Sequence, residues 1–284
     1  MKKRIFSAFI AAFLVLCLSI PQVFAETYFE SGHFKFSKNG GDKITIAGYD
    51  NFSSDLLIPS TIIDYTVVSI AANTFIDNTT IKTAVLPDTL ESIGNSAFTR
   101  AGCLESITIP ENCNTLGKAV FQDCSSLNNI EIKSSPTVID VQMFFRCDKL
   151  ESVVLPESVE TINAFAFADC SLLKSVTIPK TTTSIAANAF RNCNNLIIYG
   201  YKDSYAQQYA SENNIGFFAL DAYDLGDVDM NGIVNVSDAT FIQYYASSIK
   251  EFSDYQLSLA DVNGDGSVNV SDATQIQRIL VGFE

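Results

Sequence analysis

Hydrophobic residues in the middle of the chain recur every 23 positions. A phenylalanine opens the pattern at Phe75 and repeats in the same register five more times, at Phe98, Phe121, Phe144, Phe167 and Phe190. An isoleucine or leucine lies five residues before each phenylalanine, and another lies six residues after it. Between them recur alternating segments such as SITIP, SVVLP and SVTIP, which predict short strands that end at proline. Because a single coil of this kind cannot bury its own apolar face, the sequence predicts a mostly β solenoid whose 23-residue coils stack as a parallel sheet.

Two different patterns flank the repeats and predict caps. The segment HFKFSKNGGDKITIAGY, residues 33–49, predicts a hairpin with an Asn-Gly-Gly turn at the N-terminal end. The segment DSYAQQYASENNI, residues 203–215, predicts a helix with Asp203 or Ser204 as its N-cap and with Tyr205, Tyr209 and Ile215 facing inward. The solenoid with both caps is therefore expected to span residues 26–220.

The first 25 residues have the pattern of a secretory signal peptide. Three basic residues at positions 2–4 precede an apolar run over residues 5–20, and Val23-Phe24-Ala25 forms a small-residue cleavage site. A membrane anchor is the alternative, but the run is shorter than the roughly 20 apolar residues that a spanning helix needs. We expect cleavage before Glu26 and a secreted, extracellular protein without membrane insertion, because no second apolar run follows Ala25.

The charge of the chain excludes one class of partner. The formal net charge is -14, and removal of the basic signal segment makes it more negative still. Nucleic acid and anionic membranes are poor partners for such a surface.

The cysteines follow the same period as the phenylalanines. Cys124, Cys147, Cys170 and Cys193 are 23 residues apart, whereas Cys103 and Cys113 lie outside this register. Equivalent positions in stacked strands lie about 4.8 Å apart, which is a poor fit to the Cβ approach that a disulfide needs. We therefore expect a buried column of free thiols rather than disulfides or a metal site, and Cys103 with Cys113 is the pair for which a bridge stays open.

The outward-facing strand positions offer little material for catalysis. They form two columns of small, mostly uncharged side chains: Thr83, Ser106, Asn129, Ser152 and Ser175 beside Val85, Thr108, Glu131, Val154 and Thr177. A glycosidase needs two carboxylates, and this face offers only Glu131. The single histidine, His33, lies in the cap hairpin, and the chain has no tryptophan. No catalytic residues are predicted, and the solenoid is interpreted as a binding surface or a spacer whose ligand the sequence does not name.

Two twelve-residue segments near the C-terminus have the composition of calcium loops. They read DVDMNGIVNVSD over residues 227–238 and DVNGDGSVNVSD over residues 261–272. A calcium loop takes oxygen ligands from positions 1, 3, 5, 9 and 12, a backbone carbonyl from position 7, and a glycine turn at position 6. Both segments fill every position, so two Ca²⁺ ions are predicted. The ligands would be Asp227, Asp229, Asn231, Ile233, Asn235 and Asp238 in the first loop, and Asp261, Asn263, Asp265, Ser267, Asn269 and Asp272 in the second.

These patterns resemble two known families. The repeat Leu-x-x-Ile-x-Ile-Pro followed by Ile-x-x-x-x-Phe-x-x-Cys resembles the BspA-type leucine-rich repeat of secreted bacterial and protist surface proteins. A loop followed by a helix, twice, with Asp rather than Glu at position 12, resembles the type I dockerin of cellulosome systems. That resemblance spans residues 222–284 and includes a short helix between the copies, which Ser253 can cap and which would run to Leu259.

The second resemblance implies a partner and a set of contacts. A dockerin is a small all-α, calcium-binding module that docks onto a cohesin module of a scaffoldin. By position, the contacts would be Val236, Ser237, Gln243, Tyr244 and Ser248 in the first copy, and Val270, Ser271, Gln277, Arg278 and Gly282 in the second. The Val-Ser pairs differ from the Ser/Thr pairs of the best-known type I group, which leaves the cohesin class open. The core of the module is assigned to Ala239, Ile242, Ala273, Ile276 and Ile279.

Together these features predict a non-catalytic, secreted component of a cellulosome-like complex active in polysaccharide catabolism. The solenoid would mediate binding or adhesion, and the dockerin would attach it to the scaffoldin. Two alternatives stay open: the solenoid binds plant polysaccharide directly, or the chain is an undetected hydrolase. Neither has a characteristic set of residues in its favour.

Overall fold

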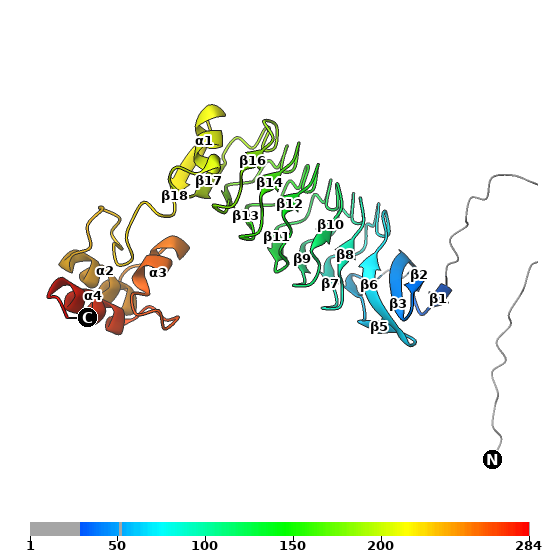
Figure 1. Ribbon diagram of the computed structural model, residues 1–284, viewed down its shortest axis with the longest axis horizontal. Helices are drawn as coiled ribbons and strands as arrows, with labels where there is room; N and C mark the ends of the chain where they lie inside the picture. Colours follow the sequence, from blue (N-terminus) through cyan, green and yellow to red (C-terminus); the bar gives the residue numbers. More distant parts are fainter. Residues whose placement is uncertain (1–28, 51–52, 284) are drawn as a thin grey trace, which may run out of the picture.

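The computed structural model describes residues 29–50 and 53–283 of the chain. It consists of an elongated β solenoid followed by a small helical module (Figure 1). The predicted signal peptide lies outside the described residues.

The solenoid is built from short strands, two in most coils. The strands are β1 (Phe29–Ser31), β2 (Phe34–Gly40), β3 (Lys43–Tyr49), β4 (Asp55–Leu57), β5 (Thr61–Ile62), β6 (Tyr65–Ile70), β7 (Thr83–Val85), β8 (Ser92–Ile93), β9 (Ser106–Ile109), β10 (Thr115–Leu116), β11 (Asn129–Ile132), β12 (Val138–Ile139), β13 (Ser152–Val154), β14 (Thr161–Ile162), β15 (Ser175–Thr177), β16 (Ser184–Ile185), β17 (Ile197–Gly200) and β18 (Gly216–Ala219).

The strands of successive coils pair in parallel with the register that the sequence period dictates. In the pair β9 and β11, Ser106 lies opposite Asn129 and Ile107 opposite Ile130. The predicted hairpin is formed by β2 and β3, which pair antiparallel, and β3 then pairs in parallel with β6 of the first coils. A parallel-sheet solenoid of stacked coils is thus confirmed, with the hairpin at one end and the helical module at the other (Figure 1).

The phenylalanines form a continuous stack through the centre of the solenoid. The six rings are nearly parallel, with centroid distances from 4.8 Å to 5.7 Å between neighbours. A tyrosine ring closes each end of the stack edge-on: Tyr49 of the hairpin lies against Phe75, and Tyr209 lies against Phe190. The caps therefore protect the two ring faces that have no further coil to cover them.

The C-terminal cap contains helix α1 (Tyr205–Glu212). Ser204 is its N-cap and accepts a hydrogen bond from the backbone N–H of Gln207. Tyr209 is buried and Ile215 packs against the core, as expected, but Tyr205 is 40% exposed. The inward orientation expected for Tyr205 is wrong: it shares the helix face of Tyr209, four residues later, but as the first residue of the helix it stays exposed.

The column of cysteines lies beside the phenylalanine stack. The thiols of Cys124, Cys147, Cys170 and Cys193 each contact the carbonyl oxygen of the phenylalanine in the preceding coil, at 3.0 Å to 3.2 Å. All six described cysteines are free, Cys103 and Cys113 included. Burial raises the pKa of Cys113 and of Cys124 to about 12, so both are protonated at neutral pH.

Buried, protonated thiols should be unreactive in the folded protein. At neutral pH we expect a thiol reagent such as DTNB to modify only Cys103, which is partly exposed, and to modify six cysteines of the mature chain after denaturation. Reductant should leave the melting temperature of the solenoid nearly unchanged. A denatured count of four or fewer would show that a disulfide is present and would contradict the free-thiol column.

The helical module has a small core of its own. Helices α2 (Val236–Ala246) and α4 (Val270–Leu280) pack together, and α3 (Asp254–Ala260) lies between them in sequence. Ala239, Ile242, Ala273 and Ile276 are almost fully buried, as predicted. Ile279 is 50% exposed, so its assignment to the core is wrong. It lies in the last turn of α4.

Candidate calcium loops and partner-binding face

The first predicted calcium loop is closed around two buried carboxylates. Asp227 accepts hydrogen bonds from the backbone N–H groups of Asn231, at 3.1 Å, and Gly232, at 2.8 Å. Asp238 accepts one from the N–H of Asp229 at 3.0 Å and one from the N–H of Asn235 at 2.9 Å. Both aspartates are fully buried, so the loop is held together from its first and last positions.

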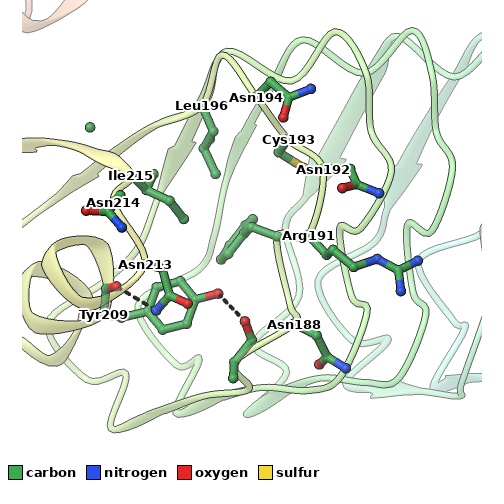
Figure 2. A pocket seen from close by; sticks show the side chains of 13 residues that line it. Asn188, Arg191, Asn192, Cys193, Asn194, Leu196, Tyr209, Asn213, Asn214 and Ile215 are labelled. Carbon is green, nitrogen blue, oxygen red and sulfur yellow. Dashed lines mark hydrogen bonds between the residues drawn. The ribbon is translucent and has the colours of Figure 1, made fainter.

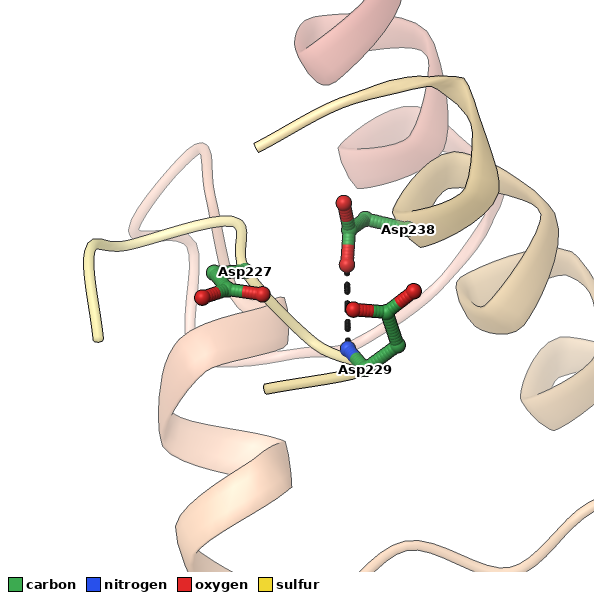
Figure 3. Close-up of side chains that lie close together, drawn as sticks. All are labelled: Asp227, Asp229 and Asp238. Carbon is green, nitrogen blue, oxygen red and sulfur yellow. Dashed lines mark hydrogen bonds between the residues drawn. The ribbon is translucent and has the colours of Figure 1, made fainter. Parts of the chain in front are cut away.

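Three carboxylates converge inside this loop. Ligand atoms of Asp227, Asp229 and Asp238 all lie within 4.8 Å of one another, and the side chains point toward a common space (Figure 3). Such an arrangement of oxygen atoms suits a hard cation such as Ca²⁺. A cation there would offset the repulsion between the three negative charges.

The second loop repeats the hydrogen bonds of the first, position by position. Asp261 accepts from the N–H groups of Asp265 and Gly266, at 3.1 Å and 3.0 Å. Asp272 accepts from the N–H groups of Asn263 and Asn269, at 3.2 Å and 2.9 Å. The equivalence extends to the backbone, because position 4 has a positive φ in both loops, at Met230 and at Gly264. The two loops therefore share this hydrogen-bond pattern despite their different sequences at positions 3, 4, 5 and 7.

The residues at position 9 have a second role that the sequence analysis did not assign. Asn235 and Asn269 are the N-caps of α2 and α4, and the side-chain oxygen of each accepts a hydrogen bond from the backbone N–H two residues later. Asp238 and Asp272 complete a capping box in each helix. The spacing Asn-x-x-Asp before an apolar run carried this signal in the sequence.

The short helix between the loops forms as predicted. Ser253 caps α3 through a capping box with Gln256, and the helix continues one residue past Leu259, to Ala260. The amide of Gln256 also donates to the carbonyl of Val228 at 3.0 Å, which ties α3 to the first loop.

The residues predicted to contact a cohesin are all at the surface. They lie on α2, on α4 and just beyond the ends of these helices, and each is exposed: Val236, Ser237, Gln243, Tyr244, Ser248, Val270, Ser271, Gln277, Arg278 and Gly282. The apolar members stand out, since Val236 is 60% and Val270 58% exposed at the first turn of their helices. Exposed valines at equivalent places on two packed helices form a surface that a partner protein can cover.

The residues considered for catalysis lie apart from one another. His33 is exposed in the hairpin and pairs with Asp50 at 3.0 Å. Glu131 projects from the sheet face, where it contacts Lys133 at 3.6 Å and accepts a hydrogen bond from Thr108 at 3.2 Å. Among the residues that the structure describes, the partners found for these two side chains form neither a nucleophile–base pair nor a carboxylate pair.

A polar cavity of about 570 Å³ lies where the stack of coils ends. Residues of the last coil and of the C-terminal cap line it, and several of them are asparagines, among them Asn188, Asn192 and Asn213 (Figure 2). Tyr209 closes one side, with its hydroxyl 3.4 Å from the carbonyl oxygen of Ala187. Burial raises the pKa of Tyr209 to about 12, so this hydroxyl donates. The cap itself takes the place of the coil that would follow, because β18 pairs in parallel with β17, and the cavity is lined by the last coil on one side and by this cap on the other.

Two family models match these two parts of the chain. Residues 68–197 match the BspA type leucine rich repeat region, in six copies, and residues 225–281 match the dockerin type I domain. The fold and the paired loops define a leucine-rich repeat solenoid joined to a module of the dockerin class. The chain therefore contains a BspA-type leucine-rich repeat region and a type I dockerin domain.

Solved bacterial structures share the solenoid fold. A leucine-rich repeat protein of T. pallidum is 25% identical, with a TM-score of 0.59 over 68% of this chain and 98% of its own. One from Eubacterium ventriosum is 25% identical, with a TM-score of 0.54 over 62% of this chain and 46% of its own. A leucine rich cell surface protein of Faecalibacterium prausnitzii, 24% identical with a TM-score of 0.51, is matched over 64% of this chain and 56% of its own. The chain thus spans about half the length of two of these three proteins. None of the curated proteins matches it.

The domains found set the coarse function. Leucine-rich repeat and dockerin domains are non-catalytic, and a dockerin implies a cohesin partner. Type I dockerin domains typically bind calcium, and both families are typically extracellular or surface-associated. Across residues 29–50 and 53–283, none of the helices has the length and apolar character needed to cross a membrane.

Proposed function

We propose that this protein is a secreted, non-catalytic component of a cellulosome-like complex, attached by its dockerin to a scaffoldin cohesin. The solenoid, residues 26–220, would bind a ligand or adhere to a surface, and residues 222–284 would form the docking module. The observation that carries the proposal is the pair of equivalent loops, each of which leads directly into a helix with an exposed valine and serine at its start.

Calcium binding would order both loops. We assign one ion to each loop, held by Asp227, Asp229, Asn231, Ile233, Asn235 and Asp238 in the first, and by Asp261, Asn263, Asp265, Ser267, Asn269 and Asp272 in the second. Loop position 7 contributes its backbone carbonyl, because Ile233 has no side-chain oxygen. Isothermal titration of the metal-free chain with CaCl₂ tests the assignment, and a stoichiometry of two ions is expected.

The docking face would lie on α2 and α4. Two equivalent copies of a contact set allow a dockerin to bind a cohesin in two orientations related by a half turn. Here the Val-Ser pairs and Gln243 with Gln277 match, but Tyr244 is replaced by Arg278 in the second copy. The difference in size and charge should favour one orientation.

Single and double substitutions measure this preference. We expect Tyr244→Ala and Arg278→Ala to reduce the affinity for a type I cohesin unequally, with the larger loss about tenfold, as is typical for an aromatic or arginine anchor. Surface plasmon resonance on immobilised cohesin measures both. Thr274→Ala serves as the control, because Thr274 is an exposed residue of α4 outside the contact set. Negligible losses from both single changes, with a large loss from the double change, would show that both orientations are used.

A further inference from the structure

A cleft lies where the sheet face of the solenoid meets the dockerin. It has a volume of about 520 Å³, and its lining comes from both parts of the chain, with Thr177 and Tyr199 from the solenoid strands and Tyr255 and Ser258 from α3. In the ribbon view, α3 is the dockerin helix nearest to β17 and β18 (Figure 1). The size of the cleft is within the range of small-molecule sites.

Aromatic contacts hold the two sides of the cleft together. The ring of Phe218, on β18, packs edge-on against Tyr255 with centroids 5.0 Å apart, and it lies tilted against Tyr199 at 5.3 Å. The hydroxyl of Tyr255 donates to the carbonyl of Leu220 at 2.7 Å. Burial is the main cause that raises the pKa of Tyr255, so this hydroxyl is protonated at neutral pH. The dockerin therefore contributes an aromatic side chain at a fixed place beside the solenoid sheet.

The rest of the lining is uncharged and rich in hydroxyl groups. Ser152, Ser175, Thr177 and Ser258 are among the lining residues, and of the described residues that line the cleft none has a charged side chain. In a chain with a net charge of -14, a neutral wall of this size is a distinct surface. A second cavity of about 470 Å³ shares Ser152 and Val154 with the first and continues along the sheet face, where Glu131 adds one charged side chain to its lining, so an extended ligand has a path beyond the aromatic end.

We propose that this cleft binds a neutral oligosaccharide. Sugar rings have an apolar C–H face that packs on aromatic rings, here Tyr199, Phe218 and Tyr255, and a rim of hydroxyl groups that pair with serine and threonine. A charged ligand would find no counter-charge in the lining and would be desolvated without compensation. The proposal rests on the proposed role of the solenoid as a binding domain, and it is independent of cohesin docking.

The test is calorimetric titration of the full-length, calcium-loaded chain with cellohexaose and with xylohexaose. Binding of one of them is expected, and Tyr255→Ala should weaken it about tenfold. Thr177→Glu should weaken it similarly by placing a charge on the cleft floor. The solenoid accepts glutamate there, because Glu131 occupies the equivalent position two coils earlier. Tyr205→Ala, an exposed tyrosine outside the cleft, is the matched control and should bind like the unmodified protein.

Several results would overturn the proposal. The first is that neither oligosaccharide binds at millimolar concentrations. The second is that Tyr255→Ala and Thr177→Glu both bind the sugar as tightly as the unmodified protein does. The third is that the protein binds the acidic polygalacturonate in place of the neutral sugars. Cohesin binding is measured on the same proteins and should be unchanged. A failure of the sugar-binding proposal can thus be distinguished from a failure of the proposed cohesin docking.

Discussion

Removal of calcium should abolish cohesin binding and unfold the dockerin, while the solenoid stays folded. Asp227 and Asp238 are fully buried and, with Asp229, bring three carboxylate groups within 4.8 Å of one another. Without a cation their repulsion is poorly screened, because burial excludes the water that would weaken it. The binding free energy of the metal is then lost as folding free energy of the module.

In excess EDTA we expect cohesin affinity to fall by at least about 100-fold, which corresponds to the loss of a folded binding surface. Differential scanning calorimetry of the full chain should show two transitions with calcium and only the solenoid transition without it. Asp227→Ala and Asp261→Ala should each weaken calcium binding in the loop that carries the change. Asp224→Ala, an exposed aspartate outside the loop, is the control. Unchanged cohesin binding and circular dichroism in EDTA would refute the metal assignment.

The repeat architecture was predictable because its signal is strictly periodic. A fixed spacing places Phe98 and Phe121 at the same point of neighbouring coils, so register and core follow from the sequence alone. Individual orientations at the ends of helices were less predictable. Tyr205 and Ile279 match the helical period, but they lie in the first turn of α1 and the last turn of α4 and are 40% and 50% exposed. The helical period specifies which residues share a face of the helix, whereas the burial of each residue depends on which other element packs against that face.

The ligand positions of the loops could be counted from the sequence, but their local hydrogen bonds could not all be foreseen. Helix α2 begins inside the loop, at Val236. Asn235 therefore caps the helix and also occupies loop position 9. The contact between Phe218 and Tyr255 joins residues that the sequence assigns to separate domains. No periodicity links them, so only the folded chain reveals the cleft that they line.

The stability of the solenoid should depend strongly on the central phenylalanine stack. Phe121 is fully buried and lies 5.7 Å from both Phe98 and Phe144, measured between ring centroids. Each coil is supported only by its neighbours, so a gap in the middle of the stack weakens two interfaces at once. The rigid backbone ladders on either side limit how far the coils can collapse into the space.

We therefore expect Phe121→Ala to lower the free energy of unfolding by about 3–5 kcal/mol. For a solenoid of this size, that corresponds to a melting temperature lower by roughly 6–20 °C. Urea unfolding of the calcium-loaded chain, followed by far-UV circular dichroism, measures the change. The matched control is Phe145→Ala, because Phe145 is only partly buried and makes an edge-on contact with Phe165 outside the stack. Its loss should cost about 1 kcal/mol. Equal destabilisation by the two substitutions would mean that the stack contributes no more than an ordinary surface-facing aromatic contact.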